Sequence, residues 1–145
     1  MPRTVRYKLL NYMSDALLES YGRDLGEAFA NAAMATTSVM LDLRTISSHR
    51  VVEEVEVRGF DKANLLYNWI EAVLLKKEIE RKVFRSFEVR VYETSAGYLL
   101  KATLKGEHID PLRHRFKRDV KAVTYHEMKI EDSASRCVVR FLLDL

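Results

Sequence analysis

The sequence has few residues that cross-link or interrupt a fold: one cysteine, two prolines and five glycines among 145 residues. A single cysteine excludes an internal disulfide. Cys137 lies in an apolar run, where we expect a buried and unreactive thiol. The few prolines and glycines leave no linker that could divide the chain, so we expect one globular domain over residues 1–145.

The sequence also lacks a long apolar run, a secretion signal and a strong net charge. Residues 28–41, the longest uncharged stretch, contain polar residues and fall short of the roughly 18 apolar residues of a membrane span. The N-terminal segment has no apolar core before a small-residue cleavage site, so we expect a cytoplasmic protein. A net charge of +3 is too small for bulk attraction to nucleic acid or lipid to dominate binding.

Two segments have the periodicity of amphipathic helices. From Leu25 the apolar residues recur three and four positions apart, and Asp24 with Glu27 resembles a capping box. A second helix is predicted after Asp61, its candidate N-cap, and ends in cations that suit a helix C-terminus. We interpret these cations as a solvated helix end rather than a nucleic-acid patch. They are Lys76, Lys77, Arg81 and Lys82.

Most of the remaining chain alternates between apolar and polar residues, which is typical of strands with one wet face. Turn residues at 94–97 and 131–135 predict hairpins. The order of the elements predicts an α+β fold in which two helices pack against a largely antiparallel sheet. The predicted strands are residues 5–10, 16–21, 51–59, 87–92, 98–104, 120–130 and 136–145.

Standard catalytic motifs, such as a glycine-rich phosphate loop, a zinc spacing or a nucleophile elbow, are absent. The densest candidate is a basic segment between Pro111 and Val120, which contains one aromatic residue, Phe116. It could grip RNA phosphates or dock an acidic partner surface. A solvated loop with Phe116 in the core is the favoured interpretation. The cations of the basic segment are Arg113, Arg115, Lys117 and Arg118.

A second candidate is a pair of aspartates near the two ends of the sequence. Asp144 ends an apolar strand and precedes the carboxylate of Leu145. If Asp15 lies beside them, three oxygen donors repel one another, and Ca²⁺ or Mg²⁺, rather than zinc, would relieve the repulsion. On spacing alone, the favoured alternative is a wet strand end at Asp144 and a turn or cap residue at Asp15.

The four histidines add little to these candidates. His126 and Thr124 share a face of a predicted strand. A histidine satisfied within the sheet is favoured there, and a general base or a ligand-orienting partner is the alternative. His49, His108 and His114 lie at segment edges, where we expect contact with solvent.

Several stretches together resemble the archease family, small proteins that assist the RNA ligase of tRNA splicing. They occur in family order and span nearly the whole chain. They are residues 27–33 (EAFANAA), residues 65–71 (LLYNWIE), Asp110-Pro111 with Arg113-His114, residues 120–126 (VKAVTYH) and residues 143–145 (LDL).

The resemblance implies a non-catalytic activator that promotes guanylylation and multiple turnover of the ligase and broadens its use of nucleoside triphosphates. It also implies a calcium-type site at Asp15, Asp144 and Leu145. Where the family usually has D-H-T-A-D, residues 11–15 read N-Y-M-S-D. The first carboxylate and the histidine are therefore absent, and we expect weaker binding because Ca²⁺ affinity follows ligand charge.

Two alternatives stay open on the sequence. A metal-dependent phosphoester hydrolase would use Asp15 and Asp144 with His126 as the base, although these residues do not form a recognisable two-metal site. An RNA-binding module would use the basic segment. The leading prediction is a non-enzymatic partner of the ligase, with a divalent cation, a transient RNA contact and no membrane association.

Overall fold

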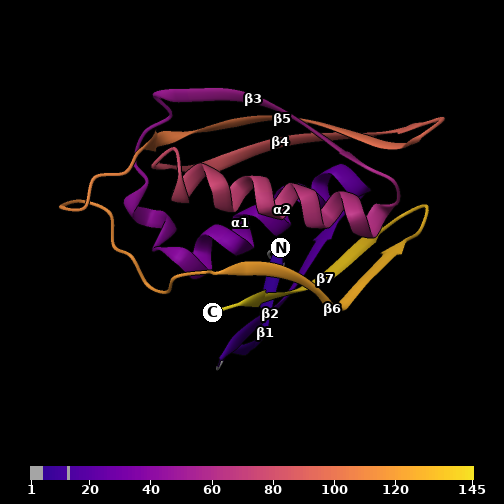
Figure 1. Ribbon diagram of the computed structural model, residues 1–145, viewed down its shortest axis with the longest axis horizontal. Helices are drawn as coiled ribbons and strands as arrows, with labels where there is room; N and C mark the ends of the chain where they lie inside the picture. Colours follow the sequence, from indigo (N-terminus) through magenta and orange to yellow (C-terminus); the bar gives the residue numbers. More distant parts are fainter. Residues whose placement is uncertain (1–4, 13) are drawn as a thin grey trace.

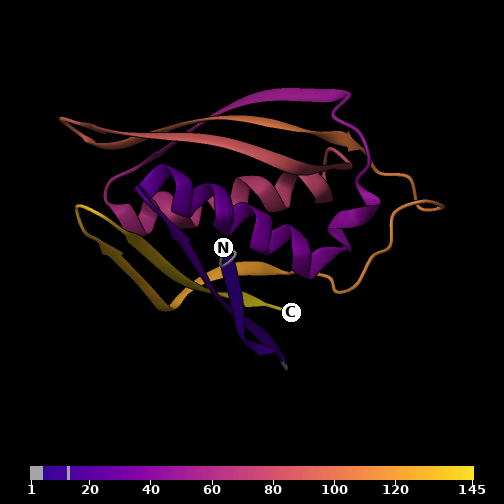
Figure 2. The ribbon, with the colours of Figure 1, turned by 180° about the vertical axis from the view of Figure 1, so that it is seen from behind.

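Two helices lie between two antiparallel sheets in the computed structural model, which describes residues 5–12 and 14–145 (Figures 1 and 2). The helices are α1 (Leu25–Met40) and α2 (Lys62–Glu78), and a 3₁₀ turn, η1 (Leu43–Thr45), follows α1. One sheet has the order β1 (Tyr7–Tyr12), β2 (Asp15–Gly22), β7 (Cys137–Asp144), β6 (Ala122–Asp132). The other has the order β3 (Val51–Gly59), β5 (Gly97–His108), β4 (Lys82–Thr94).

Both helices begin where the sequence predicts. The side chain of Asp24 accepts a hydrogen bond from the Glu27 N–H at 2.8 Å, and that of Asp61 accepts one from the Asn64 N–H at 2.7 Å. Each cap satisfies a backbone donor that the first helical turn leaves without an internal partner. These local contacts fix the starting points of the two elements that fill the centre of the molecule.

The position of the helices between two sheets explains their burial. Trp69 of α2 is fully buried, and its Nε1 donates to the Phe29 carbonyl of α1 at 2.9 Å. Thr36 and Thr37 are also buried, and their hydroxyls donate to carbonyls one turn earlier in α1. The polar atoms on these two helices are therefore satisfied within the core.

The predicted α+β class with two helices and antiparallel strands is confirmed. The strands divide between two sheets, which strand periodicity does not reveal because it carries no information on partners. β4 begins five residues before the predicted start, at Lys82, and has a register shift between Phe84 and Ser86. Cys137 is buried, as expected.

Three of the four cations at the end of α2, Lys76, Lys77 and Lys82, form ion pairs, whereas Arg81 is exposed as a solvated helix end would be. Lys76 and Lys82 both pair with Glu53 of β3. The Lys76 side chain is only 17% exposed, so it ties the helix end to the three-stranded sheet. Neither helix of the described residues has the length and apolar composition that crossing a membrane requires.

Candidate functional site

The two aspartates predicted as metal ligands lie side by side across β2 and β7. Asp15 is directly opposite Asp144 in the ladder, and one step further the Leu145 N–H donates to the Ser14 carbonyl at 3.3 Å. Bonded and non-bonded pairs alternate in antiparallel ladders. Asp15 and Asp144 therefore form a non-bonded pair, in which side chains lie closest and Cα atoms are about 4.5 Å apart. We call Asp15, Asp144 and Leu145 the acidic edge.

The acidic edge faces away from the helices. Ala16 and Leu143, the sequence neighbours of the two aspartates, are fully buried. Because successive side chains of a strand point to opposite faces, the carboxylates of Asp15 and Asp144 lie on the outer face of the sheet. Asp144 is exposed and Asp15 is half-buried. Figures 1 and 2 show the C-terminus beside the β1–β2 hairpin.

The donor set of the acidic edge fits a hard cation better than zinc. Across residues 5–12 and 14–145, no group of three or more His, Cys, Asp and Glu side chains is arranged to hold a metal ion. The acidic edge offers two such side chains, and its third predicted donor, Leu145, would contribute a main-chain oxygen. Like charges directly opposite each other destabilise a sheet. An oxygen-only, open set of this kind suits Ca²⁺ or Mg²⁺, with water completing the coordination.

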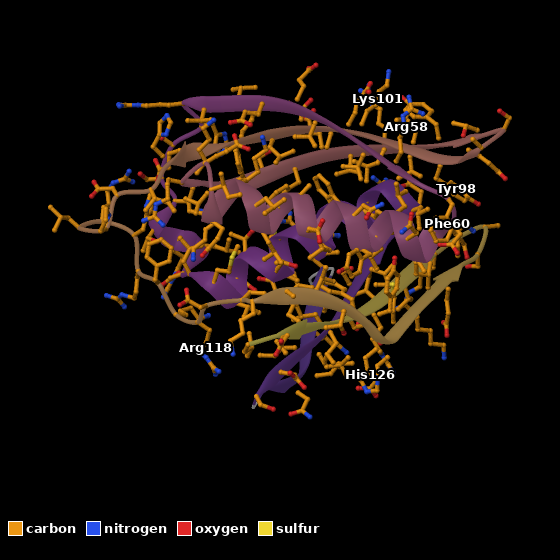
Figure 3. The ribbon with its side chains drawn as sticks, viewed as in Figure 1. Arg58, Phe60, Tyr98, Lys101, Arg118 and His126 are labelled. Carbon is orange, nitrogen blue, oxygen red and sulfur yellow. The ribbon has the colours of Figure 1, made fainter. Side chains whose placement is uncertain are left out.

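Thr124 lies close to the acidic edge, whereas His126 is displaced from it. β6 pairs Thr124 with Leu142, two positions from Asp144. The register then shifts before Lys129, and His126 lies in this irregular segment, exposed at the bend of β6 (Figure 3). The predicted shared strand face of Thr124 and His126 is therefore interrupted, and the geometry gives no support to a hydrolase with His126 as its base.

His114 is buried, not in contact with solvent as the sequence predicts. It is 4% exposed, and the Asp110 N–H donates to its Nδ1 at 2.9 Å. Because Nδ1 accepts, Nε2 carries the proton of the neutral ring. Nε2 lies 2.7 Å from Glu107 Oε1 and donates to it. Both ring nitrogens are satisfied, which offsets the cost of removing the ring from water.

Glu107, near the end of β5, holds the loop that follows this strand in place, and the sequence analysis did not identify it. Its carboxylate accepts hydrogen bonds from Arg113, the Ser48 hydroxyl and the Ser47 N–H, in addition to His114. Burial on its own raises the pKa of Glu107, but these donors outweigh it and hold the pKa well below the usual value. Two of the donors lie 59 and 60 residues away, so no local pattern could identify the cluster.

The four cations of the basic segment have different surroundings. Arg113 is engaged by the buried carboxylate and by Ser47. Lys117 Nζ donates to the Ser38 carbonyl at the end of α1, at 2.8 Å. Arg115 and Arg118 are exposed, and Arg118 extends from the loop on the side of β6 (Figure 3). A single RNA-gripping loop therefore has little support, although Lys117 borders a larger basic surface described below.

Phe116 is 41% exposed rather than buried in the core. Its backbone forms an isolated bridge with Leu41, and its ring lies 5.7 Å from Lys77 Nζ. The loop is thus held to the end of α1 by its backbone, while the ring covers the end of α2. The predicted position of Phe116 in the core is therefore wrong, and the loop is attached through its backbone instead.

A model of the Archease protein family (MTH1598/TM1083) matches residues 7–145. The chain is 43% identical to protein archease of Pyrococcus abyssi over 126 residues, which cover 87% of this chain and 88% of that protein. It is 36% identical to protein archease of Sulfurisphaera tokodaii over 140 residues, covering 97% and 99% of the two chains.

Two solved structures have a similar fold. The solution structure of Methanobacterium thermoautotrophicum protein 1598 superposes with a TM-score of 0.81 at 33% identity, covering 96% of this chain and 98% of that one. A Thermotoga maritima crystal structure, described as an archease and possible chaperone, has a TM-score of 0.64 at 14% identity, with coverage of 100% and 98%. This second structure supports the fold alone.

Proposed function

The chain belongs to the archease family, and from this premise we propose that it is a non-catalytic activator of a tRNA-splicing RNA ligase. The activation would promote guanylylation and multiple turnover of the ligase and broaden its use of nucleoside triphosphates. The acidic edge would act by holding a divalent cation, Ca²⁺ or Mg²⁺. The partner would be a protein, which is in keeping with the description of the Thermotoga maritima relative as a possible chaperone.

The observation that carries this proposal is the pairing of Asp15 with Asp144 on an exposed sheet face. A stable fold gains nothing from two carboxylates directly opposite each other. The destabilisation that these two carboxylates cause is explained if the pair binds a cation or a cationic group of a partner. Because the pair lies at the end of two strands, it can approach a partner surface without disturbing the core.

The acidic edge is suited to assist transfer of a guanylate, since such transfers depend mainly on positioning and on neutralising charge. A bound divalent cation would supply positive charge and exchangeable coordination positions for phosphate oxygens. Asp15 and Asp144 would fix the place of that charge. Thr124, on the neighbouring strand, would act as a hydrogen-bonding neighbour of the acidic edge.

The test is a ligation assay with the partner ligase and RNA substrate in excess, without addition, with this protein, and with Asp144→Ala. We expect the wild type to restore multiple turnover and Asp144→Ala to fail. Glu56→Ala is the matched control, because Glu56 is a 59% exposed carboxylate on the other sheet. Full activation by Asp144→Ala would refute the role of the acidic edge.

A chain extended beyond Leu145 tests the third donor separately. Additional residues replace the terminal carboxylate of Leu145 with a neutral peptide carbonyl and leave Asp15 and Asp144 unchanged. We expect a partial loss of activation, because the charge of the donor set falls. Unchanged activation at limiting cation concentration would restrict the site to the two aspartates.

A further inference from the structure

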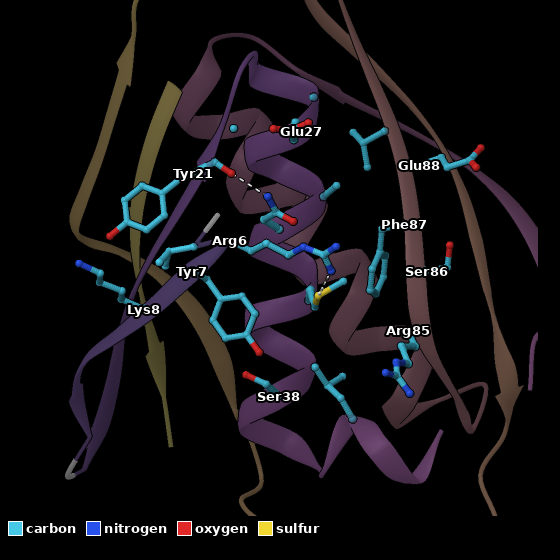
Figure 4. A pocket seen from close by; sticks show the side chains of 18 of the residues that line it. Arg6, Tyr7, Lys8, Tyr21, Glu27, Ser38, Arg85, Ser86, Phe87 and Glu88 are labelled. Carbon is cyan, nitrogen blue, oxygen red and sulfur yellow. Dashed lines mark hydrogen bonds between the residues drawn. The ribbon is translucent and has the colours of Figure 1, made fainter. Parts of the chain in front are cut away.

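A groove runs along α1 between the β1–β2 hairpin and β4 (Figure 4). One wall is formed by β1 and β2 and the other by β4, and α1 forms the floor. β1 and β4 are edge strands of their sheets, so nothing in the described chain closes the groove. Its volume is about 1790 Å³. It is separate from the acidic edge, none of whose residues line it.

The groove concentrates the positive charge of the molecule. Eight of its lining residues are Arg or Lys and four are Asp or Glu, a local net charge of +4. The whole chain has a net charge of +3, so all residues outside the groove together have a net charge of −1. The groove is therefore more basic than the rest of the molecule, although the overall net charge is small. Basic surfaces of this kind attract polyanions.

Three of the four acids are already engaged within the fold. Asp24 caps α1, as described above, and Glu27 pairs with Arg23 at 3.1 Å. Asp42 pairs with Arg44 at 2.8 Å. The fourth acid, Glu88, is exposed and points away from the groove in Figure 4. The acids of the groove therefore neutralise only two of its eight cations by direct pairing.

The other six cations have no ion pair with a carboxylate of the described residues. Four of them contact neutral groups, which place the cation without cancelling its charge. Arg6 donates to the Met34 sulfur at 3.7 Å, Arg85 to the Ile46 carbonyl at 3.5 Å and Lys117 to the Ser38 carbonyl, while Arg136 lies 5.2 Å from the ring of Tyr21. Lys8 and Arg90 are exposed at the rim: Lys8 points away from the groove in Figure 4, and Arg90 lies two residues after Glu88 in β4 and so shares its outward face.

We propose that this groove binds single-stranded RNA. The four inward cations are Arg6, just before β1, Arg85 of β4, and Lys117 and Arg136 of two loops, so they lie on both sides of a helix whose 16 residues rise about 24 Å. This distribution of cations suits a flexible single strand of RNA, which carries one negative charge per nucleotide. The ring of Tyr7 points into the groove near Ser38 (Figure 4) and offers a surface on which an unpaired base can stack.

The choice of RNA among polyanions rests on the proposed function, in which the partner acts on RNA. The groove lies on a different part of the molecule from the acidic edge, so one RNA strand and one ligase can be engaged together. The basic segment contributes Lys117 to this surface, whereas Arg113 is used to hold its own loop. The RNA contact is thus assigned to the groove rather than to the loop.

The experiment measures fluorescence anisotropy of a labelled single-stranded RNA of about 12 nucleotides, titrated with the full chain in the absence of ligase. The test variant is Arg6→Gln with Arg85→Gln, which removes one cation from each wall. The matched control is Arg58→Gln with Lys101→Gln, two exposed cations of β3 and β5 that do not line the groove (Figure 3). Asp144→Ala is included to separate this site from the acidic edge.

We expect the wild type and the control to bind alike, and the groove variant to bind about tenfold more weakly at low salt. The slope of log K against log salt should fall in magnitude by about 1.4 in the groove variant, since each lost phosphate contact removes about 0.7. Asp144→Ala should bind as the wild type does, whatever its effect on ligation.

Three results would overturn the proposal. One is the absence of RNA binding at low salt. Another is an equal loss of affinity in the groove and control variants, which would indicate attraction by overall charge alone. The third is equal or tighter binding of a polyglutamate peptide of matched charge, which would assign the groove to an acidic protein segment. None of these results bears on activation by the acidic edge, so the two proposals fail separately.

Discussion

Glu107 accepts a hydrogen bond from Nε2 of His114 at 2.7 Å, and both side chains are buried. This contact joins the end of β5 to the loop that leads to β6. The same loop pairs with the end of α1 through Phe116 and with β7 through the Lys121 N–H, which donates to the Asp144 carbonyl at 2.8 Å. The buried pair therefore supports the strand connection beside the acidic edge.

Replacing Glu107 with glutamine tests this support. Glu107→Gln keeps the size of the side chain but removes the charge that faces Arg113 and the second strong acceptor for Ser48. We expect a loss of about 2 kcal/mol in the free energy of unfolding, because donors are left unsatisfied at a buried position. Urea unfolding measures the change. Glu56→Gln, at an exposed pair, should cost less than about 0.5 kcal/mol, and equal losses would contradict the argument.

The acid sensitivity of the protein should depend on Glu107. Its pKa is lowered in the fold from the ordinary value of 4.5, so its stabilising contribution is present above that value and is lost as the pH falls. The difference in unfolding free energy between the wild type and Glu107→Gln should be full near neutral pH and shrink near pH 3. A difference that is independent of pH would show that the carboxylate charge is not what stabilises the loop.

Local signals were sufficient for the helices and most strands. Asp24 and Asp61 mark helix starts because a cap acts within three residues. The alternation of residues 51–59 identifies β3 because burial on one face repeats every second residue. Pairing is different, because the partner of a strand lies at any distance along the chain. The division into two sheets is set by such pairings and was not predictable.

The acidic edge and the groove differ in how much of each could be predicted from the sequence. Asp15 and Asp144 are 129 positions apart in the sequence. Charge crowding and the family resemblance predicted that they lie together, and the pairing of β2 with β7 places them directly opposite each other. Arg6 directly precedes β1 and Arg85 lies in β4, the edge strands of separate sheets. No sequence pattern joins them, so the groove required the three-dimensional arrangement.

Gly26 tests the packing of the floor of the groove against its wall. A Cβ at this position would lie 2.5 Å from the Val89 carbonyl oxygen of β4, so α1 would have to move away from the strand. Gly→Ala in a helix ordinarily stabilises by up to about 1 kcal/mol. We expect the opposite sign for Gly26→Ala, with a loss of about 1–3 kcal/mol, measured by urea unfolding. A stabilised variant would show that α1 and β4 are not in close contact.

Divalent cations should stabilise the folded chain through the acidic edge. A ligand that binds only the folded state stabilises it according to its concentration relative to Kd, and ten times Kd contributes about 1.4 kcal/mol. With few charged donors we expect a Kd on the order of 1 mM for Ca²⁺. Thermal unfolding of the wild type should therefore shift upward in about 10 mM Ca²⁺ and return with a chelator. Asp144→Asn should lose the shift, whereas Glu56→Gln should keep it. An equal shift in both variants would place the cation elsewhere on the molecule.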